Sequence, residues 1–149
     1  MRETTGKIRV DCIISIAILL ILFLFTAQAT ANGPLVNQDN KEGTISIASF
    51  KKIIDENPES ILLIDVREPE EYEKGRLKTA INIPIDDLED RIDSFPVDKP
   101  VVYICETGER SGEAYDITVL LRDDLRVYYL DAVLTFDKQG NYKIEPIEK

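Results

Sequence analysis

Short apolar runs alternate with amphipathic stretches from Thr44 to the end of the chain. Four of these runs predict strands, at residues 61–64, 81–83, 101–104 and 127–130. Apolar runs without polar interruption are typical of parallel strands, which are covered on both faces by crossover helices. Since amphipathic segments separate the runs, the pattern predicts an α/β domain with a mainly parallel central sheet and helices on both faces.

Four amphipathic segments predict the helices that would cover this sheet. The first follows Ser49, a predicted N-cap, and stops at Pro58. Pro69 and Gly75 bracket a second, short helix. The fourth begins near Ser111 and has the clearest helical spacing of apolar positions. The positions that mark the first, third and fourth helices are Phe50, Ile53 and Ile54, then Ile85, Leu88 and Ile92, then Ala114, Ile117, Thr118 and Leu121.

The first 31 residues have the composition of an export signal. Arg2, Lys7 and Arg9 precede an apolar run at residues 13–25, and small residues follow up to Ala31. The run has 13 residues, fewer than the roughly 20 that a helix needs to cross a bilayer, although the uncharged stretch continues to residue 38. Residues 1–31 are therefore predicted to be either a cleaved signal peptide or an N-terminal membrane anchor. Both forms deliver the rest of the chain to the periplasm or the extracellular space.

Residues 32–43 are polar and rich in turn formers, so they predict a linker, and residues 44–149 are predicted to form one domain. Acidic residues outnumber basic residues by 28 to 18, which gives a formal net charge of −10. Because nucleic-acid binding depends on a basic surface, neither DNA nor RNA is expected as a partner. Contact with a membrane is expected only through the N-terminal segment, if that segment is not cleaved.

The chain contains no histidine, which removes the commonest general base, the commonest zinc ligand and every Cys–His or Ser–His catalytic pair. The sequence therefore indicates no metal site and no cofactor. Of the two cysteines, Cys12 precedes the apolar run, so cleavage would leave Cys105 as the only thiol of the exported domain. A lone cysteine is in many proteins only a small buried apolar side chain.

The position of Cys105 favours a nucleophile instead. Cys105 directly follows the predicted strand at 101–104, at the edge of a parallel sheet where ligands bind. Gly108 lets the following loop turn so that its N–H groups point inward, and the next helix directs its positive end to the same place. Together with Arg110, these features favour a thiolate, so activation does not require a histidine.

Three segments of the chain resemble the single-domain rhodanese family. They are residues 65–72 with the sequence Asp-Val-Arg-Glu-Pro-Glu-Glu-Tyr, residues 80–84 with Ala-Ile-Asn-Ile-Pro, and the Cys-x-x-Gly-x-Arg-Ser loop at 105–111. The resemblance covers about residues 44–136. It implies a rhodanese-like fold and a sulfurtransferase activity that needs no cofactor.

The resemblance also implies roles for the loop. Cys105 would attack a sulfane donor such as thiosulfate or a persulfide, hold the sulfur as a persulfide, and pass it to a thiol or cyanide acceptor. Loop N–H groups fixed before the reaction would stabilise the anionic sulfur. The residues expected to form this anion-binding loop are Glu106, Thr107, Gly108, Glu109, Arg110 and Ser111.

Two residues near the loop have alternative interpretations. Arg110 either supplies the cation for the persulfide or the departing anion, or forms a salt bridge to Asp65 or Glu68 that shapes the loop. Asp65, at the end of a predicted strand, either orients Arg110 and the loop amides or caps the next turn.

Two further residues are expected to support the site. Arg67 is predicted to be structural and to pair with Glu70 or Glu71. Ser111 is predicted to cap the following helix. Whether its N–H also joins the cradle of N–H groups around the sulfur is left open at this point.

Glu106 and Glu109 place two negative charges beside the nucleophile. Like charges about 4 Å apart repel by roughly 4 kcal/mol at an effective dielectric near 20. The hypothesis that follows is that a neutral or protein-borne sulfane donor is preferred over the thiosulfate dianion.

Other activities fit the sequence less well. Phosphatases built on the same fold place five residues between cysteine and arginine, whereas four separate Cys105 from Arg110, so the ring suits one sulfur atom better than a phosphate. Arsenate reduction requires further thiols. The remaining alternative is an inactive binding module whose acidic surface recruits a basic partner protein, and the retained Cys105 speaks against it.

Overall fold

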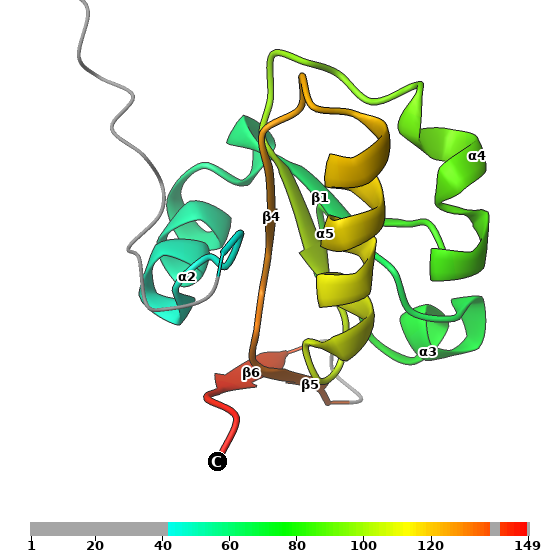
Figure 1. The fold of residues 1–149 in the computed structure, drawn as a ribbon. Coiled ribbons are helices and arrows are strands. Elements are labelled where there is room, and N and C mark those ends of the chain that lie inside the picture. The colour runs from blue at the N-terminus through cyan, green and yellow to red at the C-terminus, as the bar shows by residue number, and fades with distance from the viewer. Residues whose placement is uncertain (1–41, 138–140, 149) are drawn as a thin grey trace, which may run out of the picture. The chain divides into compact units, whose positions relative to one another are not determined.

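The computed structural model describes residues 42–137 and 141–148 (Figure 1). The predicted export segment at 1–31 and the predicted linker up to residue 41 lie outside the described residues. Among the helices in the described ranges, none has the length and apolar character needed to cross a membrane.

A four-stranded parallel sheet forms the centre of the domain. Its strands are β1 (Leu62–Asp65), β2 (Ile81–Asn82), β3 (Val101–Ile104) and β4 (Val127–Tyr129), arranged in the order β2-β1-β3-β4. In the register of the two central strands, Asp65 lies opposite Ile104. The predicted parallel sheet is confirmed, and each predicted strand overlaps an observed one.

The central strands are buried on both faces, which explains their unbroken apolar runs. In β3 and just beyond it, Val101, Tyr103 and Cys105 belong to one apolar cluster, whereas Val102 and Ile104 belong to another. Because side chains alternate along a strand, these two clusters lie on opposite faces of the sheet. The side chain of Cys105 therefore lies on the same face of the sheet as Val101 and Tyr103.

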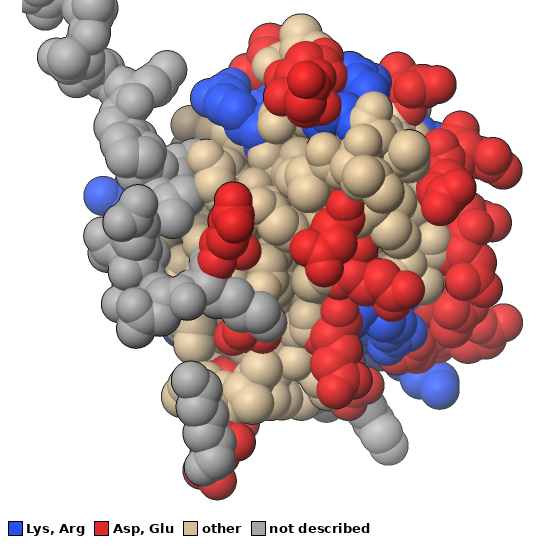
Figure 2. Space-filling model, viewed as in Figure 1, with Lys and Arg blue, Asp and Glu red and all other residues tan. Residues whose placement is uncertain are grey.

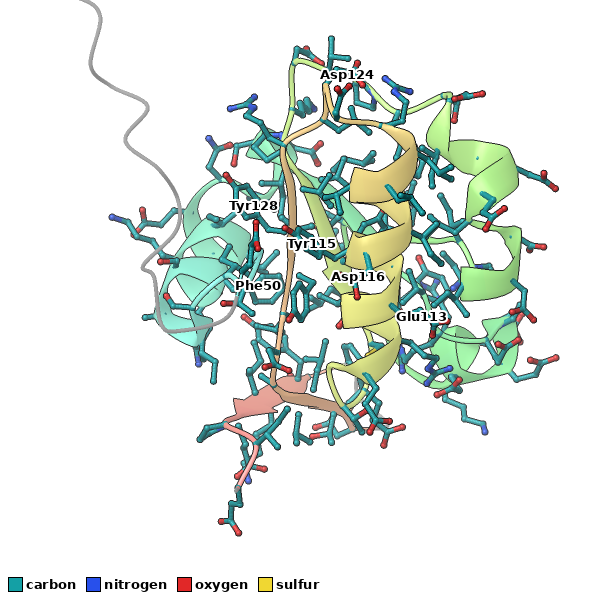
Figure 3. The ribbon with its side chains drawn as sticks, viewed as in Figure 1. Phe50, Glu113, Tyr115, Asp116, Asp124 and Tyr128 are labelled. Atoms are coloured by element: carbon teal, nitrogen blue, oxygen red, sulfur yellow. The ribbon has the colours of Figure 1, made fainter. Side chains whose placement is uncertain are left out.

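Helices cover both faces, as predicted. On one side, α2 (Ile47–Glu56) buries Phe50 and Ile53 against the sheet. On the other side lie α4 (Glu89–Ile92) and the long α5 (Glu109–Leu121) (Figure 1). Figure 3 shows Phe50 on the α2 side of β4 and Tyr115 on the α5 side.

Two details of the predicted helices were wrong. The N-cap of α2 is Ser46 and not Ser49, because the Ser46 Oγ accepts the Ser49 N–H at 3.1 Å and the helix starts at Ile47. At the end of α5, Leu121 is 51% exposed. This helix lies against the sheet through the small side chains of Ser111, Ala114 and Thr118, so close packing and not a wide apolar face holds it.

The remaining helical segments are short. As predicted between Pro69 and Gly75, α3 (Pro69–Lys74) forms a single helix. The predicted third helix is divided into a 3-10 turn, η2 (Ile85–Asp87), and α4. A further 3-10 turn, η1 (Pro58–Ser60), joins α2 to β1.

A two-stranded antiparallel hairpin of β5 (Val133–Phe136) and β6 (Tyr142–Glu145) was not predicted. Leu134 of β5 is buried, and its N–H donates to the carbonyl of Glu106 at 2.8 Å. The hairpin therefore supports the loop that follows β3.

Candidate active site

The loop after β3 places Cys105 at the carboxyl edge of the sheet, where α5 begins. Gly108 is the N-cap of α5 and has a left-handed backbone with φ 88° and ψ −19°. A Cβ atom at this position would also meet the Asp131 Oδ1 at 2.8 Å and the Ala132 N at 3.3 Å. Only glycine fits both the backbone conformation and the available space.

This backbone turn directs two N–H groups at the sulfur of Cys105. The Gly108 N–H donates to Sγ at 3.2 Å and the Ser111 N–H donates at 3.4 Å. The thiol is 2% exposed and belongs to the apolar cluster on the α5 side of the sheet. In surroundings with little water, N–H groups that are already aimed at a developing negative charge stabilise it strongly.

The Ser111 hydroxyl completes the contacts to the sulfur. Its Oγ lies 3.5 Å from the Cys105 Sγ and 3.0 and 3.2 Å from the carbonyl oxygens of Gly108 and Leu130. Because the single hydroxyl hydrogen points to a carbonyl, the oxygen accepts the S–H of the neutral thiol. The prediction that Ser111 caps the helix was wrong, because α5 begins two residues earlier, with Gly108 as its N-cap.

Asp65 and Arg67 form a buried ion pair at the end of β1. The Asp65 carboxylate is fully buried and accepts from the Arg67 Nη2 at 2.6 Å and Nε at 2.9 Å. The guanidinium also donates to the carbonyl of Gly75 at 2.8 Å and lies over the ring of Phe136, 4.8 Å from its centroid. Each buried charge thus has a partner, as low-dielectric surroundings require.

This pair corrects two expectations. Arg67 is structural as predicted, but its carboxylate partner is Asp65 and not Glu70 or Glu71, since the side chain turns back toward β1. Asp65 does not orient Arg110, because Arg67 donates to both of its carboxylate oxygens and Arg110 pairs with Glu71. Asp65 also accepts the Arg67 backbone N–H at 3.1 Å, so it caps the next turn as the alternative interpretation predicted.

Arg110 pairs with Glu71 of α3. Its Nη1 and Nη2 donate to the two carboxylate oxygens at 2.6 and 2.8 Å, in a two-pronged pair. The prediction that Arg110 pairs with Asp65 or Glu68 was wrong, because the first turn of α3 presents Glu71 and not Glu68 to Arg110. Glu68 instead donates its backbone N–H to the Glu71 Oε2 at 3.1 Å and forms a capping box with it.

The Arg110–Glu71 pair shifts the pKa of both of its members. The hydrogen bond from Arg110 lowers the pKa of Glu71 to about 2, although partial burial acts in the opposite direction. The same hydrogen bond raises the pKa of Arg110, and the negative charge of the Glu71 carboxylate adds to this effect. Both members of the pair therefore stay charged at neutral pH.

Glu71 was missing from the candidate site residues. A Glu three residues after an N-cap signals a capping box, and the segment 68–71 has that pattern. The pattern reveals the local role of Glu71 but not its contact with an arginine 39 residues further along the chain.

The other predicted loop residues lie at the surface. Glu106, Thr107 and Glu109 are exposed, so the two carboxylates face solvent around the loop. Figure 2 shows many further red carboxylate side chains on the viewed face of the molecule.

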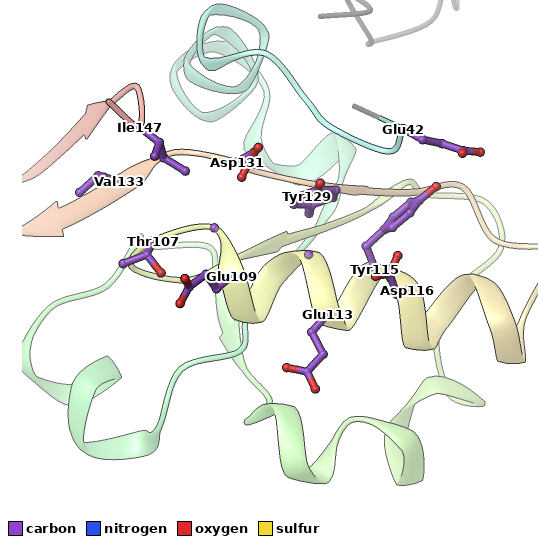
Figure 4. Close-up of a pocket in the computed structure, with 12 residues that line it drawn as sticks. Glu42, Thr107, Glu109, Glu113, Tyr115, Asp116, Tyr129, Asp131, Val133 and Ile147 are labelled. Carbon is purple, nitrogen blue, oxygen red and sulfur yellow. The ribbon is translucent and has the colours of Figure 1, made fainter. Parts of the chain in front are cut away.

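An open pocket of about 790 Å³ lies along the outer side of this loop and along α5 (Figure 4). Tyr115 and Tyr129 line it, with their ring centroids 5.4 Å apart. Burial, and then the charges of Glu42 and Asp116, raise the pKa of Tyr115. The acidic residues around the pocket are Glu42, Glu109, Glu113, Asp116 and Asp131.

The domain family is settled by comparison with known sequences. The family described as the rhodanese-like domain matches residues 46–132, more than half of the chain. The chain belongs to the rhodanese-like domain family. This confirms the resemblance found in the sequence.

Relatives of this rhodanese-like chain are named as sulfurtransferases. It is 41% identical to the thiosulfate sulfurtransferase PspE of Escherichia coli over 56 residues, and this match covers 36% of this chain and 54% of the relative. It is 36% identical over 56 residues to a sulfurtransferase of Allochromatium vinosum, covering 38% of this chain and 52% of the relative. The chain spans between 37% and 64% of the length of three matching Bacillus subtilis proteins.

A solved structure agrees with the fold. The rhodanese-related protein of Thermoplasma volcanium superposes with a TM-score of 0.51 and is 30% identical, over 59% of this chain and 82% of that one. The rhodanese-like fold predicted from the sequence is thereby confirmed.

Proposed function

We propose that this rhodanese-like protein is a sulfurtransferase in which Cys105 carries the sulfane sulfur as a persulfide. The observation that supports this most strongly is the aim of the Gly108 and Ser111 N–H groups at the Cys105 Sγ. A buried cysteine that served only as an apolar side chain would not need a glycine-dependent turn that directs two donors at its sulfur.

The reaction has two balanced steps. In the first, the Cys105 thiolate attacks the sulfane sulfur, the sulfur–sulfur bond of the donor breaks, and its electron pair leaves with sulfite from thiosulfate or with a thiolate from a persulfide. In the second, a thiolate or cyanide attacks the outer sulfur of the Cys105 persulfide, and the cysteine leaves as a thiolate. No oxidant, metal or cofactor is needed for either step.

The loop residues stabilise the negative charge in both steps. The N–H donors of Gly108 and Ser111 hold the inner sulfur in place, and the helix end adds a partial positive charge. Arg110 is the cation nearest the outer sulfur or the departing anion in this proposal, acting while it remains held by Glu71. We also propose that Asp65 and Arg67 fix the base of the loop without touching substrate.

The preferred donor carries little negative charge. Glu106 and Glu109 are exposed at the loop, where the thiosulfate dianion would approach. Two like unit charges at about 4 Å repel by roughly 4 kcal/mol at an effective dielectric near 20. A neutral donor or a persulfide on a protein avoids most of this repulsion.

The location of the reaction follows from the first 31 residues. We propose that they export the domain to the periplasm or the extracellular space, either as a cleaved signal or as an anchor, because basic residues precede their apolar run. The sulfur donor and acceptor would then be molecules of that compartment.

A turnover assay tests the proposed function. The full chain is incubated with thiosulfate or with N-acetylcysteamine persulfide, and with cyanide as acceptor, and thiocyanate is measured. The wild type and Cys12→Ser, which removes the other cysteine, are expected to form thiocyanate, and Cys105→Ser is not. Equal rates for the wild type and Cys105→Ser would overturn the proposal, as would the absence of turnover with both donors.

A further inference from the structure

The only cation of the loop at 105–111 is bound to a carboxylate that belongs to another element. Arg110, in the first turn of α5, meets Glu71 of α3 through two hydrogen bonds of 2.6 and 2.8 Å. Both side chains are partly exposed, at 31% and 28%, so the pair is accessible to dissolved anions.

Glu71 is held in this position independently of Arg110. Its Oε2 accepts the backbone N–H of Glu68 at 3.1 Å, and Pro69 starts the helix with a fixed backbone angle. The carboxylate thus has a partner on its own helix in addition to the guanidinium. An incoming anion has to compete with a carboxylate that is already oriented.

Pairing with Glu71 reduces the number of N–H groups and the positive charge that Arg110 can present to an anionic donor. A guanidinium binds planar or tetrahedral anions best through a fork of two N–H groups, and Glu71 occupies one such fork of Arg110. The carboxylate also neutralises the positive charge locally. Glu106 and Glu109 are exposed in the same loop, so the charged side chains of the loop and Glu71 together are net negative.

We propose that Glu71 is a specificity-determining residue that selects against dianionic sulfur donors by keeping Arg110 paired. This inference rests on the proposed sulfurtransferase function and names its substrate class, the persulfides of thiols. The attack of Cys105 is the same for both kinds of donor. Thiosulfate brings two negative charges that stay on the sulfite as it leaves, whereas a thiol persulfide releases a thiolate with one.

Glu71→Gln is the informative variant, because it removes the charge and keeps the shape. Glutamine at the third helical position preserves the capping box, so α3 retains its start. Glu70→Gln is the matched control, since Glu70 is the exposed neighbour on the same helix and loses the same charge. The double variant Glu71→Gln/Arg110→Gln tests whether the effect passes through Arg110.

Steady-state kinetics of the full-length proteins with cyanide as acceptor measure the effect. Thiosulfate is compared with N-acetylcysteamine persulfide, whose only ionisable group is the persulfide itself. Glu71→Gln is expected to lower the KM for thiosulfate by about fivefold, the size of effect that one unit charge has at a partly exposed site, and to change the KM for the persulfide much less. Glu70→Gln is expected to resemble the wild type, and the double variant is expected to lose the gain.

Three results would overturn the role of Glu71. They are an unchanged thiosulfate KM in Glu71→Gln, an equal gain in Glu70→Gln, and an equal change with both donors. Loss of sulfur loading at Cys105 with both donors in every protein would instead overturn the sulfurtransferase function itself. Thermal unfolding of each variant confirms that the comparison is made between folded proteins.

Discussion

The N–H of Gly108 and the sulfur of Cys105 are 3.2 Å apart, and this contact exists because Gly108 adopts a left-handed backbone. The same residue ends the loop and starts α5. The hydrogen bond to the Cys105 sulfur and the start of the helix therefore depend on one glycine.

Gly108→Ala is expected to lower both the stability of the domain and its activity. The new Cβ would meet the Asp131 Oδ1 at 2.8 Å, and the left-handed backbone adds strain, so the variant is expected to lose about 1–3 kcal/mol of unfolding free energy and most of its thiocyanate formation. Urea unfolding and the turnover assay check this. Lys52→Ala at an exposed position of α2 serves as control, and an active, equally stable Gly108→Ala would contradict the account of the loop.

Asp65→Asn is expected to destabilise the domain severely. The substitution keeps the shape of the side chain but leaves the Arg67 guanidinium, almost fully buried, without a counter-charge. Breaking a buried ion pair on one side costs about 3–5 kcal/mol. Urea unfolding measures the loss, and Asp98→Asn at an exposed loop position is the control. A loss as small as that of the control would show that Arg67 is not held by Asp65.

The Arg110–Glu71 pair predicts a dependence of stability on acid pH. The pKa of Glu71 is lowered from 4.5 to about 2 in the folded protein by the hydrogen bond from Arg110. The contribution of Glu71 to stability is therefore complete above about pH 4.5 and disappears as the pH falls toward 2.

Unfolding of wild type and Glu71→Gln at several pH values tests this dependence. Because the pair is partly exposed, the wild type is expected to be more stable by about 1 kcal/mol at neutral pH. The difference is expected to shrink below pH 4.5. A difference that does not vary with pH would contradict the assigned pair.

Tyr103 predicts a dependence at alkaline pH. Burial raises its pKa from 10.0 to about 12, against the opposing effect of its 2.6 Å hydrogen bond with Thr118. The unfolded chain releases this proton first, so the contribution of Tyr103 is complete below pH 10 and is lost as the pH rises toward 12. In Tyr103→Phe, alkaline unfolding is expected to be shallower across this interval. An identical alkaline decline in both proteins would be evidence against burial of the phenol in the native state.

The parallel sheet could be predicted from the sequence, but the hairpin of β5 and β6 could not. The runs at β1 and β3 are unbroken because both faces of these strands are covered, so they were visible without a structure. β6 alternates between half-buried and exposed positions, and the exposed Thr135 interrupts the buried and half-buried residues of β5, so neither strand is an unbroken apolar run. A half-exposed hairpin has a much weaker signal of this kind.

Within the site, local features were predictable and long-range pairings were not. Cys105 and Gly108 were identified because strand, loop and helix follow one another directly in the sequence. The partner of Arg110 depended on which of several acidic residues in segment 68–71 faces the loop, and this is decided by how α3 packs. Residues with several possible partners nearby cannot be paired from spacing alone.

The central claim is that Cys105 carries sulfur, and intact-mass measurement tests it most directly. The full-length protein is incubated with a persulfide donor without acceptor, desalted, and weighed alongside Cys105→Ser and Cys12→Ser. The account predicts a gain of one sulfur atom in the wild type and Cys12→Ser, no gain in Cys105→Ser, and loss of the added sulfur when cyanide is supplied. An unchanged mass for the wild type, or the same gain in Cys105→Ser, would contradict it.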